Sequence, residues 1–308
     1  MNLKEIDQIE ITSLVDNYTD LLRTDSTPVV KRPSLPYRET LFAEHGLSLF
    51  ITIWDGDNAV SILMDTGASD IALLHNASRS GVPMSDISAM VISHGHDDHM
   101  GGMKAVFQHE SRSIPVYIHP GSLNLRQKRI PGHPPIEIEP EDVESLIRAG
   151  ADFIFTPGPT RFCHDRFLIT GEVERSTEFE RINPVYYVQN SGTWIPDLFH
   201  DDQALIFHLK GKGLVIITGC AHAGIINTVQ YARKITGVKQ VYAVVGGFHL
   251  SGLFFKPIIE PTIMAMKMID PAFVVPMHCT GWKAINRFAA EMPEQFFLNS
   301  VGTTYVFE

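Results

Sequence analysis

The sequence predicts an α/β fold, and three observations lead to that prediction. Short apolar runs, bounded by Gly, Pro, Asn or Asp, recur along the 308 residues. Stretches with the spacing of amphipathic helices separate several of these runs. Four of the predicted strands end in polar turns that contain histidine, at His94, His222, His249 and His278. Because strand ends at one edge of a sheet converge on a common crevice, we expect these side chains to lie close together.

The amino-terminal half alternates between predicted strands and helices. Residues 8–15 alternate between polar and apolar side chains, which is typical of a strand. Further strands are expected at residues 47–54, 59–64, 86–92 and 114–119. The turn at 55–58 predicts a hairpin between the second and third strands. Helices are expected at residues 70–80 and 101–109.

The middle of the chain has a different character. Residues 120–200 are rich in Pro, Arg, Glu and aromatic side chains, with few clean strands and one helical pattern at 141–149. Residues 171–180 are polar and are expected to be exposed. We interpret 120–200 as a long insertion near the edge where the histidines gather, within a single domain of residues 1–308, because no independent apolar core is apparent.

Regular structure returns in the carboxy-terminal third. The strands at 204–209 and 213–218 are expected to form a hairpin around 210–212. Helices are expected at residues 225–235 and 261–268. Later strands are expected at residues 240–245, 272–276 and 303–307.

The densest chemical signal is the string from His94 to His99, which reads H-x-H-x-D-H at the end of an apolar run. His94 and His96 are two residues apart as they leave a strand, so both imidazoles can bind one cation. Asp98 and His99 can then turn toward a second cation. Imidazole suits zinc and iron, and carboxylate oxygen suits harder ions.

Composition excludes several classes of protein. A net charge of −10 and a pI near 5.8 argue against nucleic acid as a partner. The first residues show no secretory signal, and no run approaches the length of a membrane span, so we expect a cytoplasmic protein with no membrane contact. The odd count of three cysteines (Cys163, Cys220 and Cys279) fits reduced thiols better than disulfides. The sequence is compatible with a homodimer and does not require one.

Four short segments together resemble the metallo-β-lactamase superfamily. They are Asp65-Thr66-Gly67, the string 94–99, Gly219-Cys220-Ala221-His222 and Pro276-Met277-His278. The resemblance covers nearly the whole chain and implies an αββα sandwich with a metal site at one edge. The turns at 247–250 and 278–281 resemble one subfamily. It includes an archaeal enzyme that joins a dihydropterin to a ribofuranosyl-aminobenzene phosphate, and members known only as metal-dependent hydrolases.

The resemblance also implies roles for the metal-binding side chains. His94 and His96 would belong to the first metal site, and Asp98 and His99 to the second, which His278 would complete. His222 is our choice for the third histidine of the first site. Cys220 stands where many binuclear members have a bridging aspartate, and two alternatives remain open: a thiolate ligand or a small buried residue.

Other side chains are candidates for supporting the chemistry. The resemblance assigns Asp65 to orienting an imidazole of the metal site, and the alternative is a plain turn aspartate. Asp98 and His249 are the candidate catalytic residues. His249 would touch substrate or transfer a proton, or else be a structural histidine bonded to a backbone carbonyl. The candidate substrate-binding residues lie in the polar run, which we interpret as a lid: Arg175, Thr177 and Glu180.

These observations predict a metal-dependent hydrolase that uses one or two divalent ions, with zinc as the default and iron or manganese as alternatives. The expected partner is a small-molecule substrate, and phosphorylated and pterin-like molecules are the candidates. The rival enzyme class is a transferase that condenses a dihydropterin-methyl diphosphate with an aminobenzene ribofuranosyl phosphate. A third class is a metal- or ligand-binding sensor without catalysis. Fold similarity alone does not decide among them.

Overall fold

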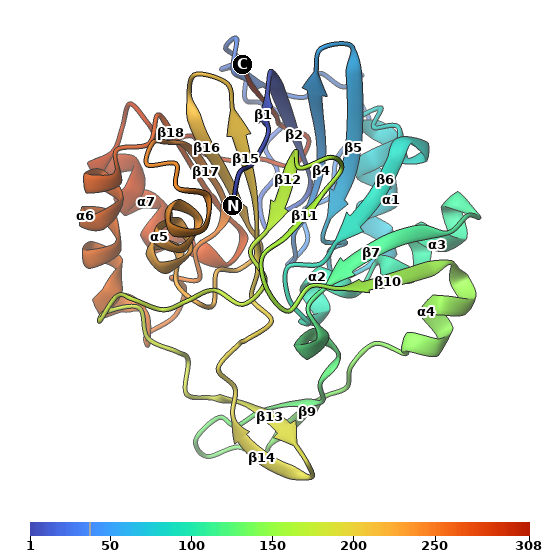
Figure 1. Cartoon of the computed structure of the whole chain (residues 1–308), viewed down its shortest axis with the longest axis vertical. Coiled ribbons are helices and arrows are strands. Elements are labelled where there is room, and N and C mark those ends of the chain that lie inside the picture. Colours follow the sequence, from blue (N-terminus) through green and yellow to red (C-terminus); the bar gives the residue numbers. More distant parts are fainter. Residues whose placement is uncertain (37) are drawn as a thin grey trace.

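A computed structural model describes residues 1–36 and 38–308, and two large β-sheets form its centre (Figure 1). The first sheet has eight strands in the order β10-β7-β6-β5-β4-β2-β19-β3. Their bounds, in that order, are Ala151–Phe155, Ile114–Ile118, Ile87–Val91, Asn58–Met64, Ser48–Asp55, Gln8–Val15, Thr304–Phe307 and Val30–Lys31. The predicted strands of the amino-terminal half are therefore confirmed, and all of them belong to this sheet.

The second sheet has seven strands in the order β11-β12-β15-β16-β17-β18, with β1 paired to β15. In the order β1, β11, β12, β15, β16, β17 and β18, their bounds are Glu5–Ile6, Thr160–Phe162, Phe167–Ile169, Ala204–Leu209, Gly213–Thr218, Val241–Gly247 and Phe273–Met277. The expected hairpin of β15 and β16 is present as an antiparallel pair. Strands β16, β17 and β18 run parallel, so their carboxyl ends meet at the same edge.

Helices cover the outer face of each sheet (Figure 1). Helices α1 (Asp70–Arg79), α3 (Met103–Glu110) and α4 (Val143–Ala149) pack on the eight-stranded sheet. Helices α5 (Ile225–Thr236), α6 (Ile259–Ile269) and α7 (Trp282–Glu291) pack on the other sheet. The short helix α2 (Asp97–Met100) holds part of the histidine string. The fold is therefore the αββα sandwich that the sequence predicted.

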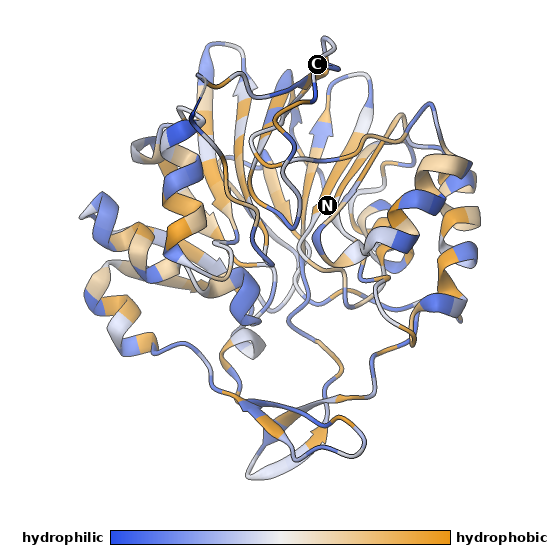
Figure 2. Ribbon diagram, turned by 180° about the vertical axis from the view of Figure 1, so that it is seen from behind, coloured by the Kyte–Doolittle hydropathy of each residue, from blue (hydrophilic) through white to orange (hydrophobic). Residues whose placement is uncertain are grey.

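Three apolar layers hold these four layers of structure together. The central layer joins the two sheets, with Ile51 and Ile62 on one side and Phe207 and Val245 on the other, all fully buried. The two outer layers lie between each sheet and its helices. Figure 2 shows the result as largely hydrophobic strands between helices that carry hydrophilic residues.

The middle of the chain is more regular than the sequence predicted. Residues 120–200 contain seven strands, β8 to β14, so the expectation of few strands is wrong. Strand β10 lies at the edge of the first sheet, and β11 and β12 belong to the second. Only the other four form a separate sheet, in the order β14-β13-β8-β9, with the bounds Thr193–Pro196, Tyr186–Asn190, Arg126–Lys128 and Ile136–Ile138.

The four-stranded sheet extends beyond one end of the sandwich (Figure 1). Its residues Ile138 and Tyr186 line a cavity together with His96 and Asp98, so this extension lies at the histidine-bearing edge. The polar run 171–180 was expected to be exposed, and that expectation is wrong for Gly171, Val173 and Glu180, which are buried. In the ranges that the structure describes, no helix has both the length and the apolar character needed to cross a bilayer.

Candidate metal centre

Parallel strands bring the early and late histidines to one place. Strands β5 and β6 are parallel, so Asp65, which follows β5, lies beside the string that follows β6. The late histidines follow β16, β17 and β18 of the facing sheet. The five predicted metal-site histidines are all buried: His94, His96, His99, His222 and His278.

The first group of donors consists of three imidazoles. His94 Nε2 lies 3.0 Å from His96 Nδ1 and 3.2 Å from His222 Nε2. All three donor nitrogens lie within 4.8 Å of one another. Nε2 of His96 is buried and has no hydrogen-bond partner among the residues that the structure describes, which is costly unless something else satisfies it. Three inward-facing imidazoles are a donor set typical of zinc sites.

The second group of donors includes a carboxylate. Asp98 Oδ2 lies 3.2 Å from His278 Nε2 and 3.9 Å from His99 Nε2. His45, which the sequence alone does not single out, places Nε2 3.5 Å from the same oxygen. His45, Asp98 and His278 form one set of possible metal donors.

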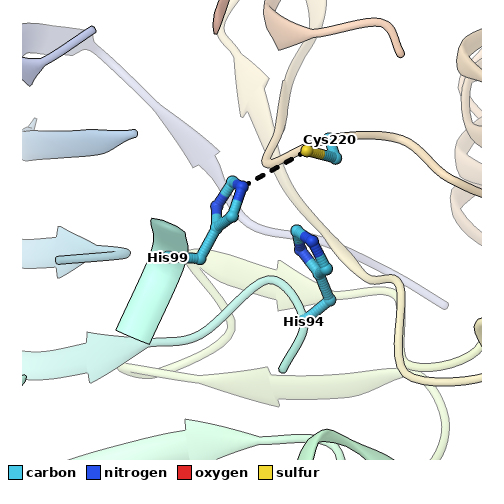
Figure 3. Close-up of side chains that lie close together, drawn as sticks. All are labelled: His94, His99 and Cys220. Carbon is cyan, nitrogen blue, oxygen red and sulfur yellow. Dashed lines mark hydrogen bonds between the residues drawn. The ribbon is translucent and has the colours of Figure 1, made fainter. Parts of the chain in front are cut away.

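Cys220 lies between the two groups. Figure 3 shows its sulfur facing the ring of His99, with His94 alongside, and the sulfur lies 3.2 Å from His99 Nε2. Cys220, His94 and His99 offer donor atoms that lie within 4.8 Å of one another. The side chain is 2% exposed. Both alternatives for Cys220, ligand and buried residue, therefore remain compatible with its place.

Cys279 is a site residue that the sequence analysis left without a role. Cys220, His249 and Cys279 offer donor atoms within 4.8 Å of one another. Gly247 lets these turns approach, because an added Cβ would lie 2.3 Å from the Gly219 carbonyl oxygen and 2.6 Å from Cys279 Sγ. The signal in the sequence was the short distance of Cys279 from His278.

Asp65 holds one imidazole of the centre in place. Its Oδ2 accepts hydrogen bonds from His99 Nδ1 at 2.6 Å and from Ser93 Oγ at 2.7 Å, and Oδ1 accepts from the Ser93 backbone N–H at 2.7 Å. The carboxylate is completely buried. It therefore fixes the ring of His99 with Nε2 directed toward Cys220 and leaves Nε2 free to bind.

Burial and neighbouring charges shift the pKa values of the buried histidines in different directions. Burial lowers the pKa of His94 and His222 well below the ordinary value and lowers that of His96 to about 3. These imidazoles are neutral, as ligation requires. Burial also opposes a charge on His99, but the carboxylates of Asp65 and Asp98 outweigh it and raise the pKa of His99 to about 9.

These shifts predict how the stability of the metal-free protein depends on pH. The folded-state pKa values of His94, His96 and His222 lie below 6.5, so the unfolded chain binds protons first as the pH falls. We expect the free energy of unfolding to fall below pH 6.5, by about 1.4 kcal/mol per pH unit for each such histidine. His99 acts oppositely, and its contribution is lost as the pH rises through about 9.

Urea unfolding of the metal-free protein across this pH range measures the effect. His96→Ala should show a shallower loss on the acid side, because one of the three neutral histidines is gone. Equal stability between about pH 4 and about pH 7 would contradict the assignment of buried neutral imidazoles.

A buried arginine supports the histidine string from the four-stranded sheet. Arg126 is 2% exposed; its Nε donates to Asp197 Oδ2 at 2.8 Å, and its guanidinium lies 2.7 Å from Asp201 Oδ1. Asp201 Oδ2 in turn accepts from the Gly95 backbone N–H at 2.8 Å. The neighbouring Asp202 accepts from the Ala223 backbone N–H and so holds the turn of His222. Nothing in the residues around Arg126 predicts this role, because its partners are far away along the chain.

A cavity of about 570 Å³ opens onto both donor groups. From the metal-binding string and the late turns it is lined by His96, Asp98, Cys220, His249, His278 and Cys279. Tyr186 and Ile138 form a wall from the four-stranded sheet. This is the volume of a small-molecule site.

The three predicted substrate-binding residues do not line this cavity. Glu180 is buried, and its carboxylate accepts from the backbone N–H groups of Ile226 and Asn227 at the start of α5. Thr177 donates to Glu180, and Arg175 donates to the Leu198 carbonyl oxygen. The contacts of Glu180 are those of a helix-capping residue, so a substrate-binding role for the three stays a prediction that their positions do not support.

This fold and this site define a family. The chain belongs to the metallo-beta-lactamase superfamily, whose family model matches residues 45–208. The matched part runs from His45 through the histidine string to β15. Proteins of this superfamily bind divalent metal ions and are mostly enzymes.

Three known proteins are similar to the chain over most of its length. The chain is 29% identical over 306 residues to the 7,8-dihydropterin-6-methyl-4-(beta-D-ribofuranosyl)-aminobenzene-5'-phosphate synthase of Methanocaldococcus jannaschii, covering 96% of each chain. It is 33% identical to the uncharacterized protein MJ0448 of the same organism, covering 80% of this chain and 88% of that one. Among solved structures, Tm1679, described as a metal-dependent hydrolase of the beta-lactamase superfamily, is 25% identical, with a TM-score of 0.71 and coverage of 97% and 98%.

Proposed function

We propose that the protein is a metal-dependent hydrolase that acts on a small-molecule ester, lactone, amide or phosphoester. One observation carries the proposal: buried histidines, an aspartate and a cysteine from both sheets face one another at the floor of a cavity of about 570 Å³. The cavity has the size of a small-molecule site and admits water. An enzyme needs this open access, whereas a purely structural metal site is closed.

The residues present fit one or two divalent ions. His94, His96 and His222 would hold the first ion, and Asp98, His99 and His278 would hold the second. Cys220 lies where its thiolate would serve both groups. The buried Nε2 of His96 supports this assignment, because no residue in the described ranges forms a hydrogen bond with it. Nitrogen, sulfur and oxygen donors together favour zinc, with iron or manganese as alternatives.

Bound ions would supply Lewis acidity and lower the pKa of a bound water toward neutrality. The chain's own residues have three tasks around that chemistry. Asp65 fixes the orientation of His99 through a 2.6 Å hydrogen bond. Arg126 and Asp201 fix the backbone of the string at Gly95. Tyr186 and Ile138 partly enclose the cavity and so shield a bound substrate from bulk water.

In this proposal His249 carries a proton to or from the substrate. It lines the cavity, its ring centre lies 4.1 Å from that of His222, and it follows the close approach of Gly247. Its Nδ1 is buried and has no hydrogen-bond partner among residues 1–36 and 38–308, which argues against the structural alternative of a bond from this nitrogen to a backbone carbonyl. A histidine in this position can donate a proton to a departing alcohol or amine.

His249→Asn should lower kcat by about 10²- to 10⁴-fold, the usual contribution of an acid or base, while metal content stays unchanged. The pH profile of kcat should lose one limb. Asparagine tolerates the positive φ of 44° at this position. The matched control is His164→Asn, because His164 also has a positive φ, of 57°, and is exposed away from the cavity. Unchanged kcat in His249→Asn would exclude His249 from proton transfer.

A transferase is the second candidate, and the similarity to the archaeal synthase over 96% of both chains favours it. In this reading the aminobenzene ribofuranosyl phosphate would attack the methyl carbon of the dihydropterin-methyl diphosphate, and diphosphate would leave. Ions held by the two donor groups would supply Lewis acidity to that leaving group. The same cavity and the same donors would serve that reaction.

A substrate screen with the zinc-loaded protein separates the candidates. It should include phosphoesters, lactones, amides and esters, and a dihydropterin-methyl diphosphate with and without the aminobenzene acceptor. Hydrolysis without the acceptor supports the hydrolase, and a coupled product only with the acceptor supports the transferase. Stoichiometric metal with no turnover of any of them would favour a sensor.

A further inference from the structure

A second hollow adjoins the metal cavity. It has a volume of about 250 Å³ and lies between the loop after β17 and the start of α7. We call it the Trp282 groove, and define it by Leu250, Leu253, Lys256, Ile259, Trp282 and Lys283.

The Trp282 groove is continuous with the metal cavity. Ser251 and Gly281 line both spaces. Gly281 allows the loop to approach the helix, because an added Cβ would lie 2.8 Å from the Cβ and Oγ of Ser251. The two sides of the groove begin directly after His249 and three residues after His278. A molecule held at the metal centre could therefore extend into it.

The wall of the groove contains large apolar side chains that are exposed to solvent. Trp282 is 71% exposed and Leu253 is 90% exposed, whereas Leu250 and Ile259 form a buried floor. A large aromatic side chain that stays in water at the mouth of a cavity offers a stacking surface for a planar ring. Exposed apolar groups gathered beside a site mark binding rather than packing.

The polar part of the groove is positive in a chain of net charge −10. Lys256 and Lys283 are both exposed, and within 1–36 and 38–308 neither forms an ion pair; the lysines that do are Lys4, Lys210, Lys234 and Lys267. Helix α7 starts at Trp282 after Gly281, which has no side chain to cap it. The first N–H groups of a helix lack partners within the helix and attract anions.

We propose that the Trp282 groove binds the part of the substrate that is not attacked, and that this part carries an aromatic ring and a phosphate group. The ring stacks on Trp282, and the phosphate is held by Lys256, Lys283 and the start of α7. This inference rests on the proposed function, since it names the substrate class of the same enzyme. Phosphate is favoured because two ammonium groups and a helix start suit a doubly charged anion.

Calorimetric binding of phenyl phosphate to the zinc-loaded protein tests the proposal. The double variant Lys256→Met/Lys283→Met should bind at least about tenfold more weakly, the usual effect of losing charged hydrogen bonds. Trp282→Ala should also weaken phenyl phosphate, but should leave inorganic phosphate, which has no ring, unchanged. All three side chains are exposed, so these variants keep the core intact.

The control variant is Lys239→Met. Lys239 is exposed just before β17, at the end of that strand away from His249, and should not affect binding. Phenyl phosphate must also bind His96→Ala, in which the first metal site is removed, with the same sensitivity to the two lysines. For a substrate found in the screen, the groove variants should raise KM and leave kcat unchanged.

Equal affinity of phenyl phosphate for wild type, the double-lysine variant and Trp282→Ala would overturn the proposal. The binding readout needs no turnover, so its failure is distinct from that of the proposed function. If the groove variants lose affinity for phenyl phosphate but the protein hydrolyses no substrate, the groove proposal stands and only the hydrolase proposal is wrong. If the protein hydrolyses a substrate and the groove variants bind phenyl phosphate normally, only the groove proposal is wrong.

Discussion

His96→Ala should remove most of the bound metal and lower activity by more than about 100-fold, the upper range for a change that only supports a ligand. His96 places Nδ1 3.0 Å from His94 Nε2, and its own Nε2 has no hydrogen-bond partner within 1–36 and 38–308. The side chain therefore contributes a donor to the first group but few hydrogen bonds to the structure. Metal analysis of the purified, zinc-reconstituted variant measures the loss.

A matched histidine variant separates metal loss from general damage. His109→Ala removes an exposed histidine near the end of α3 and should keep full metal content and activity. Circular dichroism should show that both variants stay folded, because His96 contacts the Tyr186 and Phe199 rings but anchors no backbone. Full metal content in His96→Ala would remove this residue from the first donor group.

The second large effect is expected for Asp65→Asn. The carboxylate accepts three hydrogen bonds through two oxygens, from His99 Nδ1, Ser93 Oγ and the Ser93 backbone N–H. An amide has only one acceptor oxygen, so at least one buried donor loses its partner. We expect the variant to be less stable by about 1–3 kcal/mol and to bind metal about 10- to 100-fold more weakly.

Urea unfolding and metal titration measure the two effects separately. Asp57→Asn is the control, because Asp57 is an exposed aspartate in the β4–β5 turn. It should change neither the free energy of unfolding nor metal affinity. If Asp65→Asn behaves like this control, the carboxylate does not orient His99 for binding, and the turn alternative for Asp65 is correct.

Local patterns were sufficient for most of the fold. The alternation of residues 8–15 and the apolar runs of β15 and β16 predicted strands because each side chain on one face must be buried. The strands of residues 120–200 were missed since most are three to five residues long and carry no clear alternation. Helix α7 was missed because a glycine precedes it and offers no capping signal.

The site was predictable only where its residues are close in sequence. The string from His94 to His99 indicates metal by its density alone, and the turns of His222 and His278 follow from their places after strands. Arg126 could not be found this way, because its burial depends on Asp197 and Asp201, which only the fold brings near. Glu180 was interpreted as part of a lid for the same reason. Nothing in the polar run 171–180 indicates that Glu180 caps the start of α5, which is far away along the chain.

The central claim is that the buried histidines and their neighbours hold divalent metal at the edge of the sandwich. A crystal structure of the zinc-loaded protein, with zinc located by its anomalous scattering, tests this most directly. The account predicts a zinc ion about 2.0–2.1 Å from nitrogens of His94, His96 and His222. A sulfur of Cys220 about 2.3 Å from zinc would make it a ligand as well. Zinc-soaked crystals with no anomalous peak among these three histidines would contradict the account.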